Sequence, residues 1–222
     1  MGIISKYKIV IVKNRGDIIF TIRKIEFILV MSAIILILNF KVLAQLILYK
    51  KFNPKLKEKI MNLIFRLYII VLMAVVYFPI TLGFGKNVIR RYPRIHLILW
   101  ESTIGIYKIG GIKDVIINIG GNLILLTPFI FFICYYFNKV IFKKREIICM
   151  SFEISLFIEC SQVILSLLFP NLSRAFDTID LLCNTISGLL GYYLYKIYIS
   201  IATNHKIREK VNNNKIIRKI NQ

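Results

Sequence analysis

The sequence is poor in acidic residues and in the residues that hold metals or act as nucleophiles. Asp and Glu number 11 against 31 Lys and Arg, so the formal net charge is +20. The two histidines, His96 and His205, are isolated, and the four cysteines stand singly without a Cys/His ligand spacing. HExxH and a phosphate-binding glycine loop are also missing. We therefore expect no disulfide framework, no metal centre and no cofactor.

The excess of positive charge raises the question of a nucleic-acid partner. The basic residues lie mostly between and outside the apolar runs, and no aromatic-interleaved basic groove or nucleic-acid motif accompanies them. Basic residues beside apolar runs favour contact with anionic lipid headgroups instead. Membrane lipids are thus the expected partners, and nucleic acid is not.

Apolar residues are the abundant class. They make up 57% of the chain, and mean hydropathy is +0.69, whereas a soluble domain has about 45–50% apolar residues. A helix needs roughly 20 apolar residues to cross ~30 Å of hydrocarbon, and lipid offers no partners to open backbone groups. The sequence predicts an all-α fold, a polytopic transmembrane helical bundle with four to five spans.

The apolar stretches divide the chain into three parts. A basic N-terminal region, 1–66, holds one stretch at 25–48 that either spans the membrane or lies partly in its interface, because it carries Glu26, Asn39 and Lys41. Residues 203–222 form a basic tail, helical or disordered. Between them lies the expected membrane domain, 67–202, with spans at about 67–84, 115–137, 147–169 and 181–202. Pro79 is expected to kink or end the first of these.

Lys and Arg in the short connections predict the orientation. The link 138–146 and the tail are strongly basic, whereas the link 170–180 holds only Arg174 against Asp177 and Asp180. The first two are therefore expected inside and the last outside. If 25–48 spans, the N-terminus lies outside; if it only dips in, the N-terminus lies inside. The expected location is a membrane that the chain crosses several times.

Polar residues gather on one face of the expected span 147–169. Ser155, Glu159 and Gln162 follow at i, i+4 and i+7, and at 100° per residue they form one stripe. A charged side chain in a membrane helix costs about 2.5–3.5 kcal/mol on insertion scales, so it indicates a functional residue by default. The stripe should face the bundle and not lipid.

A second polar group leads into the last span. Asp177 is placed as the N-cap and Asp180 in the first turn of a helix that begins near Thr178, where its dipole favours a carboxylate. With the expected topology these residues fall in one outer layer and suggest an outward-facing polar pocket. The ligand-binding candidates are Asn122, Ser155, Glu159, Gln162, Arg174, Asp177, Asp180 and Asn184.

The same residues also fit purely structural roles. Asp180 can cap a helix, Arg174 can pair with Asp177, and Asn122 and Gln162 can join helices by hydrogen bonds. On the last span, Ser187, Gly188 and Gly191 permit close helix packing, either within the bundle or against a second copy. A homo-oligomer therefore stays open.

Three blocks together resemble the VanZ-like family. They are NLILLTPF from Asn122 to Phe129, SLFIECSQ from Ser155 to Gln162, and RAFDTIDLLCNTISGLLGY from Arg174 to Tyr192. The segment His96–Trp100 departs from the family by lacking a proline. The resemblance implies a protein of the bacterial inner membrane, that is, of the plasma membrane, from a family whose namesake is linked to resistance to teicoplanin. Teicoplanin is an acylated glycopeptide that acts at the outer membrane face, where the polar residues are expected to converge.

Two functions stay open at this stage. The favoured one is non-catalytic binding of a lipid, a lipid-linked wall precursor or a lipoglycopeptide in the outward pocket. The alternative is a membrane enzyme that modifies a lipid headgroup or lipid-linked precursor, with the candidate catalytic carboxylates Glu159 and Asp180 as acid and base. The sequence offers no nucleophile–base pair, which favours binding over catalysis. A transporter is disfavoured, because no internal repeat is visible.

Overall fold

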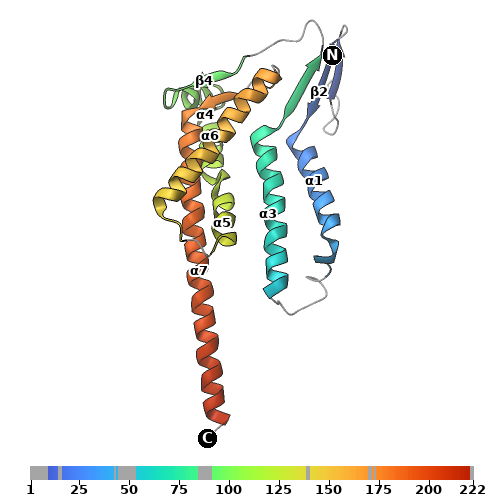
Figure 1. Ribbon diagram of the computed structural model, residues 1–222. Coiled ribbons are helices and arrows are strands. Elements are labelled where there is room, and N and C mark those ends of the chain that lie inside the picture. Colours follow the sequence, from blue (N-terminus) through green and yellow to red (C-terminus); the bar gives the residue numbers. More distant parts are fainter. Residues whose placement is uncertain are drawn as a thin grey trace. The chain divides into compact units, whose positions relative to one another are not determined.

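Helices dominate the computed structural model of the chain (Figure 1). It describes residues 10–14, 17–42, 44, 54–84, 92–138, 141–169, 172 and 174–220, with the side chains of 10–21, 54, 81–84 and 205–220 left aside. The fold is all-α, with two small sheets added. The chain divides into two compact units, residues 1–115 with 154–181, and residues 116–153 with 182–222.

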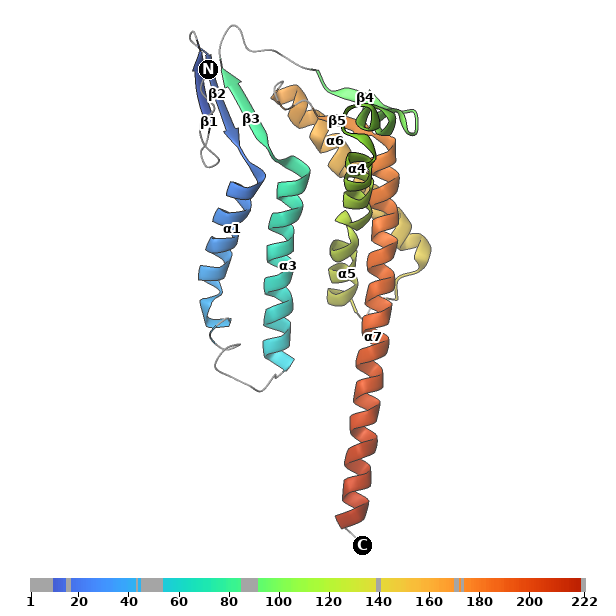
Figure 2. The same ribbon diagram turned by 180° about the vertical axis from the view of Figure 1, so that it is seen from behind.

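The first unit begins with a helical hairpin that carries a small sheet. Strands β1 (Val10–Asn14) and β2 (Asp17–Ile22) lead into helix α1 (Lys24–Leu38), and helix α3 (Pro54–Tyr77) leads into strand β3 (Ile80–Phe84). The sheet is antiparallel with the order β1-β2-β3. Figures 1 and 2 show α1 and α3 side by side with the sheet at one end.

The pairing of β2 with β3 fixes which ends of the two helices meet. Ile22 lies opposite Ile80 in the register, so the start of α1 lies beside the end of α3. The Phe27 and Phe78 rings stack there with centroids 4.3 Å apart. The sheet and this ring pair together hold the hairpin ends.

The helix ends differ from the sequence expectation. Helix α3 begins well before residue 67 and ends at Tyr77, while 80–84 of the expected span is a strand. Pro79 explains this end, because proline offers no amide hydrogen to a helix and disfavours helical geometry in the residue before it. Helix α1 has 15 residues, or roughly 22 Å at 1.5 Å per residue, which is short of the ~30 Å hydrocarbon core.

Three helical stretches among the described residues are long and apolar enough to cross a membrane. They are Lys55–Tyr77, Glu101–Tyr136 and Lys144–Leu168, so the expected count of four to five is not reached by this measure. The stretch 25–48 lies partly outside the described residues. The expected span 181–202 lies within α7 (Thr178–Ile220), a single helix of 43 residues that also includes most of the basic tail.

The rest of the first unit joins segments that are distant in sequence. Strand β4 (Arg94–His96) pairs in parallel with β5 (Ala175–Asp177), with His96 opposite Asp177. The unit also contains the start of α4 (Glu101–Leu125), the end of α6 (Lys144–Leu168) and the first turn of α7. Helix α4 bends at Gly111, whose φ of 72° suits glycine.

The second unit packs the end of α4, helix α5 (Thr127–Tyr136), the start of α6 and most of α7. The break between α4 and α5 at Leu126 is stabilised by hydrogen bonds to α7. The Leu126 amide donates to Ser187 Oγ at 2.9 Å, and Thr127 Oγ1 donates to the Ser187 carbonyl at 3.0 Å. A Cβ at Gly188 would meet the Ser151 side chain, and one at Gly191 would meet the Thr127 carbonyl oxygen. The small-residue face of α7 therefore packs within this unit.

Candidate functional site

The polar stripe of α6 faces the interior of the protein, as its spacing predicts. Ser155 and Ser166 are buried, Glu159 is 2% exposed and Gln162 is half-buried. Ser155 Oγ donates to the Leu181 carbonyl at 3.3 Å. These residues lie in the first unit, and their burial shows that the stripe faces other parts of the protein.

Glu159 is tied to the segment that begins α7. Its Oε2 accepts the backbone amide of Asp177 at 3.1 Å. The charged groups whose fields act on it are Arg174, Asp177 and Asp180. A carboxylate withdrawn from water is tolerated only with hydrogen-bond donors or opposite charge nearby. The structure supplies one amide and one guanidinium, together with two further carboxylates.

Asp177 caps α7, as the sequence predicts. Its Oδ1 accepts the backbone amide of Ile179 at 3.0 Å, and the helix begins at Thr178. This side chain satisfies one of the amide groups that a helix start leaves without a partner. Asp180 follows in the first turn and is half-buried. The position of both carboxylates near Glu159 thus follows from how α7 starts.

Replacing the cap is expected to destabilise the protein moderately. Asp177→Ala removes the acceptor for the Ile179 amide and should lower the free energy of unfolding by about 1 kcal/mol. Asp177→Asn keeps an acceptor oxygen at the same place, so it should lower the free energy of unfolding only slightly. Thermal unfolding of the purified protein in detergent measures both. Equal losses in the two variants would show that the charge, and not the cap, supports α7.

Arg174 bonds to the end of α3, and the ion pair with Asp177 that the sequence left as an alternative is not found among the described residues. Its Nη2 donates to the Phe78 carbonyl at 2.9 Å, and its backbone amide donates to Ser166 Oγ at 2.8 Å. Burial lowers the pKa of the Arg174 guanidinium, and the Glu159 charge opposes this shift. The Asp177 carboxylate instead accepts the Ile179 amide, so the structural role of Arg174 is its bond to the Phe78 carbonyl and not a pair with Asp177.

The last residues of α3 are held by α6. Gln162 Nε2 donates to the Val76 carbonyl at 2.8 Å, and the Tyr77 hydroxyl lies 2.9 Å from Ser161 Oγ. Carbonyls at a helix end lack partners within the helix, so Gln162 and Arg174 satisfy groups that would otherwise be buried unpaired. Tyr77 and Ser161 were missed from the sequence, because no local pattern links two helices so distant along the chain.

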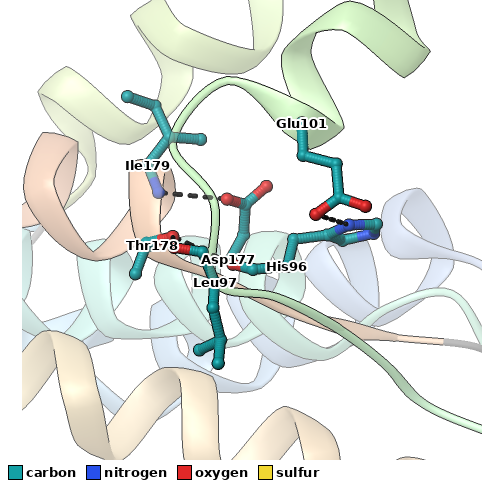
Figure 3. A network of polar contacts seen from close by, with 6 residues as sticks. All are labelled: His96, Leu97, Glu101, Asp177, Thr178 and Ile179. Carbon is teal, nitrogen blue, oxygen red and sulfur yellow. Dashed lines mark hydrogen bonds and ion pairs between the residues drawn. The ribbon is translucent and has the colours of Figure 1, made fainter.

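A further polar network lies where β4 meets β5 (Figure 3). Thr178 Oγ1 lies 2.9 Å from the His96 carbonyl and 3.1 Å from the Leu97 carbonyl, so it can donate to either. His96 Nδ1 lies 3.4 Å from Glu101 Oε2. The parallel pairing of β4 and β5 creates this network, and the sequence carries no signal of it beyond a threonine after the capping Asp177.

Asn122 and Asn184, the other two candidates, belong to the second unit. Asn122 is half-buried on α4. Asn184 is 1% exposed, and within the described part of the chain its Oδ1 has no hydrogen-bond partner. Six of the eight predicted residues thus gather in the first unit: Ser155, Glu159, Gln162, Arg174, Asp177 and Asp180.

The chemistry of this site is that of carboxylates and one guanidinium. Among the described residues, no group of three or more His, Cys, Asp or Glu side chains could hold a metal ion. Hydrogen bonds to backbone groups fix Glu159, Asp177 and Arg174 in place. Such an arrangement can bind a charged group of a ligand or move a proton.

Comparison with known proteins identifies the family. The family model described as VanZ/LLP1 matches residues 65–199. That range holds the end of α3, all of α4, α5 and α6, and the start of α7, including all eight candidate residues. Searches of curated proteins and of solved structures found no match. Since the match covers more than half of the chain, and apolar helices of membrane-spanning length lie within it, this membrane protein belongs to the VanZ/LLP1 family.

Proposed function

We propose that the protein is a multi-pass component of the bacterial plasma membrane that binds an amphiphile at the Glu159 site and so lowers the access of teicoplanin-type glycopeptides to their target. The ligand would be a lipid, a lipid-linked wall precursor or the lipoglycopeptide itself. The observation that carries the proposal is the buried carboxylate of Glu159, held on an apolar helix beside Asp177, Asp180 and Arg174.

The first support for the proposal is the free-energy cost of placing the Glu159 carboxylate in a membrane helix beside other carboxylates. A membrane helix that carries a carboxylate is penalised by about 2.5–3.5 kcal/mol on insertion scales. Two more carboxylates act on Glu159 with the same sign of charge, and like charges in one site repel each other. A cationic ligand group, such as an amine, would relieve this repulsion. In a chain with 11 acidic residues, three that converge on one site favour a binding role.

The second support for the proposal is that the Glu159 site is expected on the outer side of the membrane. The distribution of Lys and Arg predicts that the link 170–180 faces outward, and Glu159 bonds to Asp177 of that link. The start of α1 lies beside the end of α3 near Arg174. If this end is outward, the N-terminal sheet lies on the outer side too, which favours the topology in which residues 1–24 are outside.

A membrane enzyme is the second candidate. Its specific support is that the Asp180 charge acts on Glu159, because two carboxylates in one apolar site can serve as acid and base. The substrate would be a lipid headgroup or a lipid-linked precursor. Incubation of the purified protein with labelled lipids separates the two functions: a labelled product would support catalysis, and none across a broad panel would leave binding.

The binding proposal is tested in cells. The wild-type protein, produced in the membrane of a glycopeptide-sensitive bacterial host, should lower susceptibility to teicoplanin by about fourfold or more, which corresponds to roughly 0.8 kcal/mol in the effective affinity of drug for target. Vancomycin, which carries no acyl chain, should be affected less. Equal susceptibility with and without the protein would contradict a role in resistance.

A further inference from the structure

The turn between β4 and α4 exposes a run of large apolar side chains. Every residue of this turn, 97–100, is apolar and at least 47% exposed. The exposed apolar surface continues on the first part of α4 with Ile104, Tyr107 and Ile109. Apolar surface of this extent on a folded protein indicates contact with a membrane or with another protein. The position and the charges of the segment decide between the two.

Hydrogen bonds tie this turn to the start of α7. Thr178 Oγ1 lies 2.9 Å from the His96 carbonyl oxygen and 3.1 Å from the Leu97 carbonyl oxygen (Figure 3). Strand β4, directly before the turn, also pairs with β5. The turn therefore lies on the same side of the membrane as the link 170–180, which the distribution of Lys and Arg predicts to be the outer side.

The helical stretch that follows the turn is too long for a single crossing. Glu101–Tyr136 has 36 residues, or about 54 Å at 1.5 Å per residue, against ~30 Å of hydrocarbon. Residues 115–136 carry no charged side chain and reach about 33 Å as helix, which suffices to cross. The part before them is left outside the hydrocarbon core, and Gly111, with its φ of 72°, permits a change of direction between the two parts. The charged residues of the stretch all lie in that first part: Glu101, Lys108, Lys113 and Asp114.

The first part of α4 is too apolar for water and too charged for hydrocarbon. Lys108 is exposed, as are Ile104 and Tyr107 near it on the helix. Both kinds of side chain are accommodated at the boundary of headgroups and acyl chains, because a lysine can lay its stem on apolar surface and keep its ammonium in water. Trp and Tyr rings are enriched at the same depth, and Trp100, the single tryptophan of the chain, lies in this segment.

The backbone of Trp100 favours a use for its ring. Its φ is 72°, a value that bulky residues rarely adopt and that glycine adopts freely. Glycine would therefore suit this position better if only the course of the backbone mattered. An indole ring placed there at the cost of an unfavourable conformation is explained by a contact that the ring makes with lipid.

We propose that residues 97–110 form an interfacial lipid-binding segment, whose turn 97–100 inserts between the headgroups and the acyl chains on the side of the link 170–180. The partner is the bilayer itself. This contact goes beyond the function proposed above and does not depend on a role in resistance. Because Thr178 joins the segment to the start of α7, the segment also sets the depth of Asp177, whose amide binds Glu159.

The test uses the fluorescence of Trp100 in the full-length protein. The purified protein is reconstituted into phosphatidylcholine vesicles whose acyl chains carry bromine, a quencher, either near the headgroup or near the chain end. Acrylamide quenches from the water. We expect the bromine near the headgroup to quench most and acrylamide to quench weakly, with a depth of about 5–10 Å below the headgroups from the ratio of the two lipids.

A variant with its tryptophan in the middle of α6 provides the deep reference. Residue 157 is exposed on that helix, so the bromine near the chain end should quench Trp100→Phe/Phe157→Trp most; Trp100→Phe alone is the blank. Strong quenching of Trp100 by acrylamide and not by lipid would place the turn in water. Weak quenching by both would place it against protein, such as a second copy of the chain, and quenching as deep as that of the reference would place it in a span. Each of these three results would overturn the proposal.

Discussion

Gly191→Ala is expected to lower the free energy of unfolding by about 2–3 kcal/mol, although alanine favours helix over glycine by about 1 kcal/mol. The added Cβ would overlap the carbonyl oxygen of Thr127, and Ile130 Cβ would lie only 3.2 Å away. A backbone oxygen cannot rotate aside as a long side chain can. Helix α7 would have to move away from α5, which would stretch the hydrogen bonds from Leu126 and Thr127 to Ser187.

The same substitution elsewhere in the second unit provides the control. A Cβ at Gly121 meets no heavy atom within 4 Å, so Gly121→Ala should leave the stability unchanged or raise it by about 0.5–1 kcal/mol. Thermal unfolding and the yield of monodisperse protein in detergent compare the two variants. Equal stability of Gly191→Ala and Gly121→Ala would show that α7 does not pack against α5 as described.

The parts of the site that could be predicted from sequence are those set by local spacing. Ser155 and Glu159 are one helical turn apart, so their common burial follows from the geometry of any α-helix. The cap at Asp177 is equally local, because it involves only the amide of Ile179 two residues later. The sequence left open whether the small-residue face of α7 packs within the bundle or against a second copy of the chain. Its contacts with Thr127 and Ser151 place it within the second unit.

The parts that could not be predicted depend on pairings across long stretches of sequence. Strand β2 pairs with β3, and β4 pairs with β5, in a chain whose apolar runs otherwise read as helices. The periodicity of a single segment says nothing about a partner strand so far away. The acceptors of the Gln162 and Arg174 side chains, which are the carbonyls of Val76 and Phe78, could not be predicted, because the end of α3 was expected at Phe84 and not at Tyr77.

Glu159→Gln is expected to weaken the protection against teicoplanin without unfolding the protein. The glutamine oxygen can still accept the Asp177 amide, so α6 and the start of α7 should remain joined. An amide cannot, however, provide the negative charge with which a cationic ligand group would pair, and a hydrogen bond to a charged group contributes about 1.5–3 kcal/mol. Affinity for a cationic ligand group should therefore fall by at least about tenfold.

Glu153→Gln is the matched control for this charge. Glu153 lies six residues earlier on the same helix, and its side chain is exposed. It should protect as the wild type does, at equal amounts of protein in the membrane. Teicoplanin susceptibility is compared in cells that carry the wild type, either variant or no protein.

The extent to which Glu159→Gln loses protection against teicoplanin distinguishes a binding role of the carboxylate from a catalytic one. A binding site that also uses Arg174, Asp177 and Asp180 would lose part of its affinity, so protection should be partial. A catalytic acid or base cannot be replaced by an amide, so a complete loss would favour the enzyme. If Glu159→Gln protects as fully as Glu153→Gln, the charge serves neither role. The hydrogen bond to Asp177 would then be the reason for a polar residue at this depth.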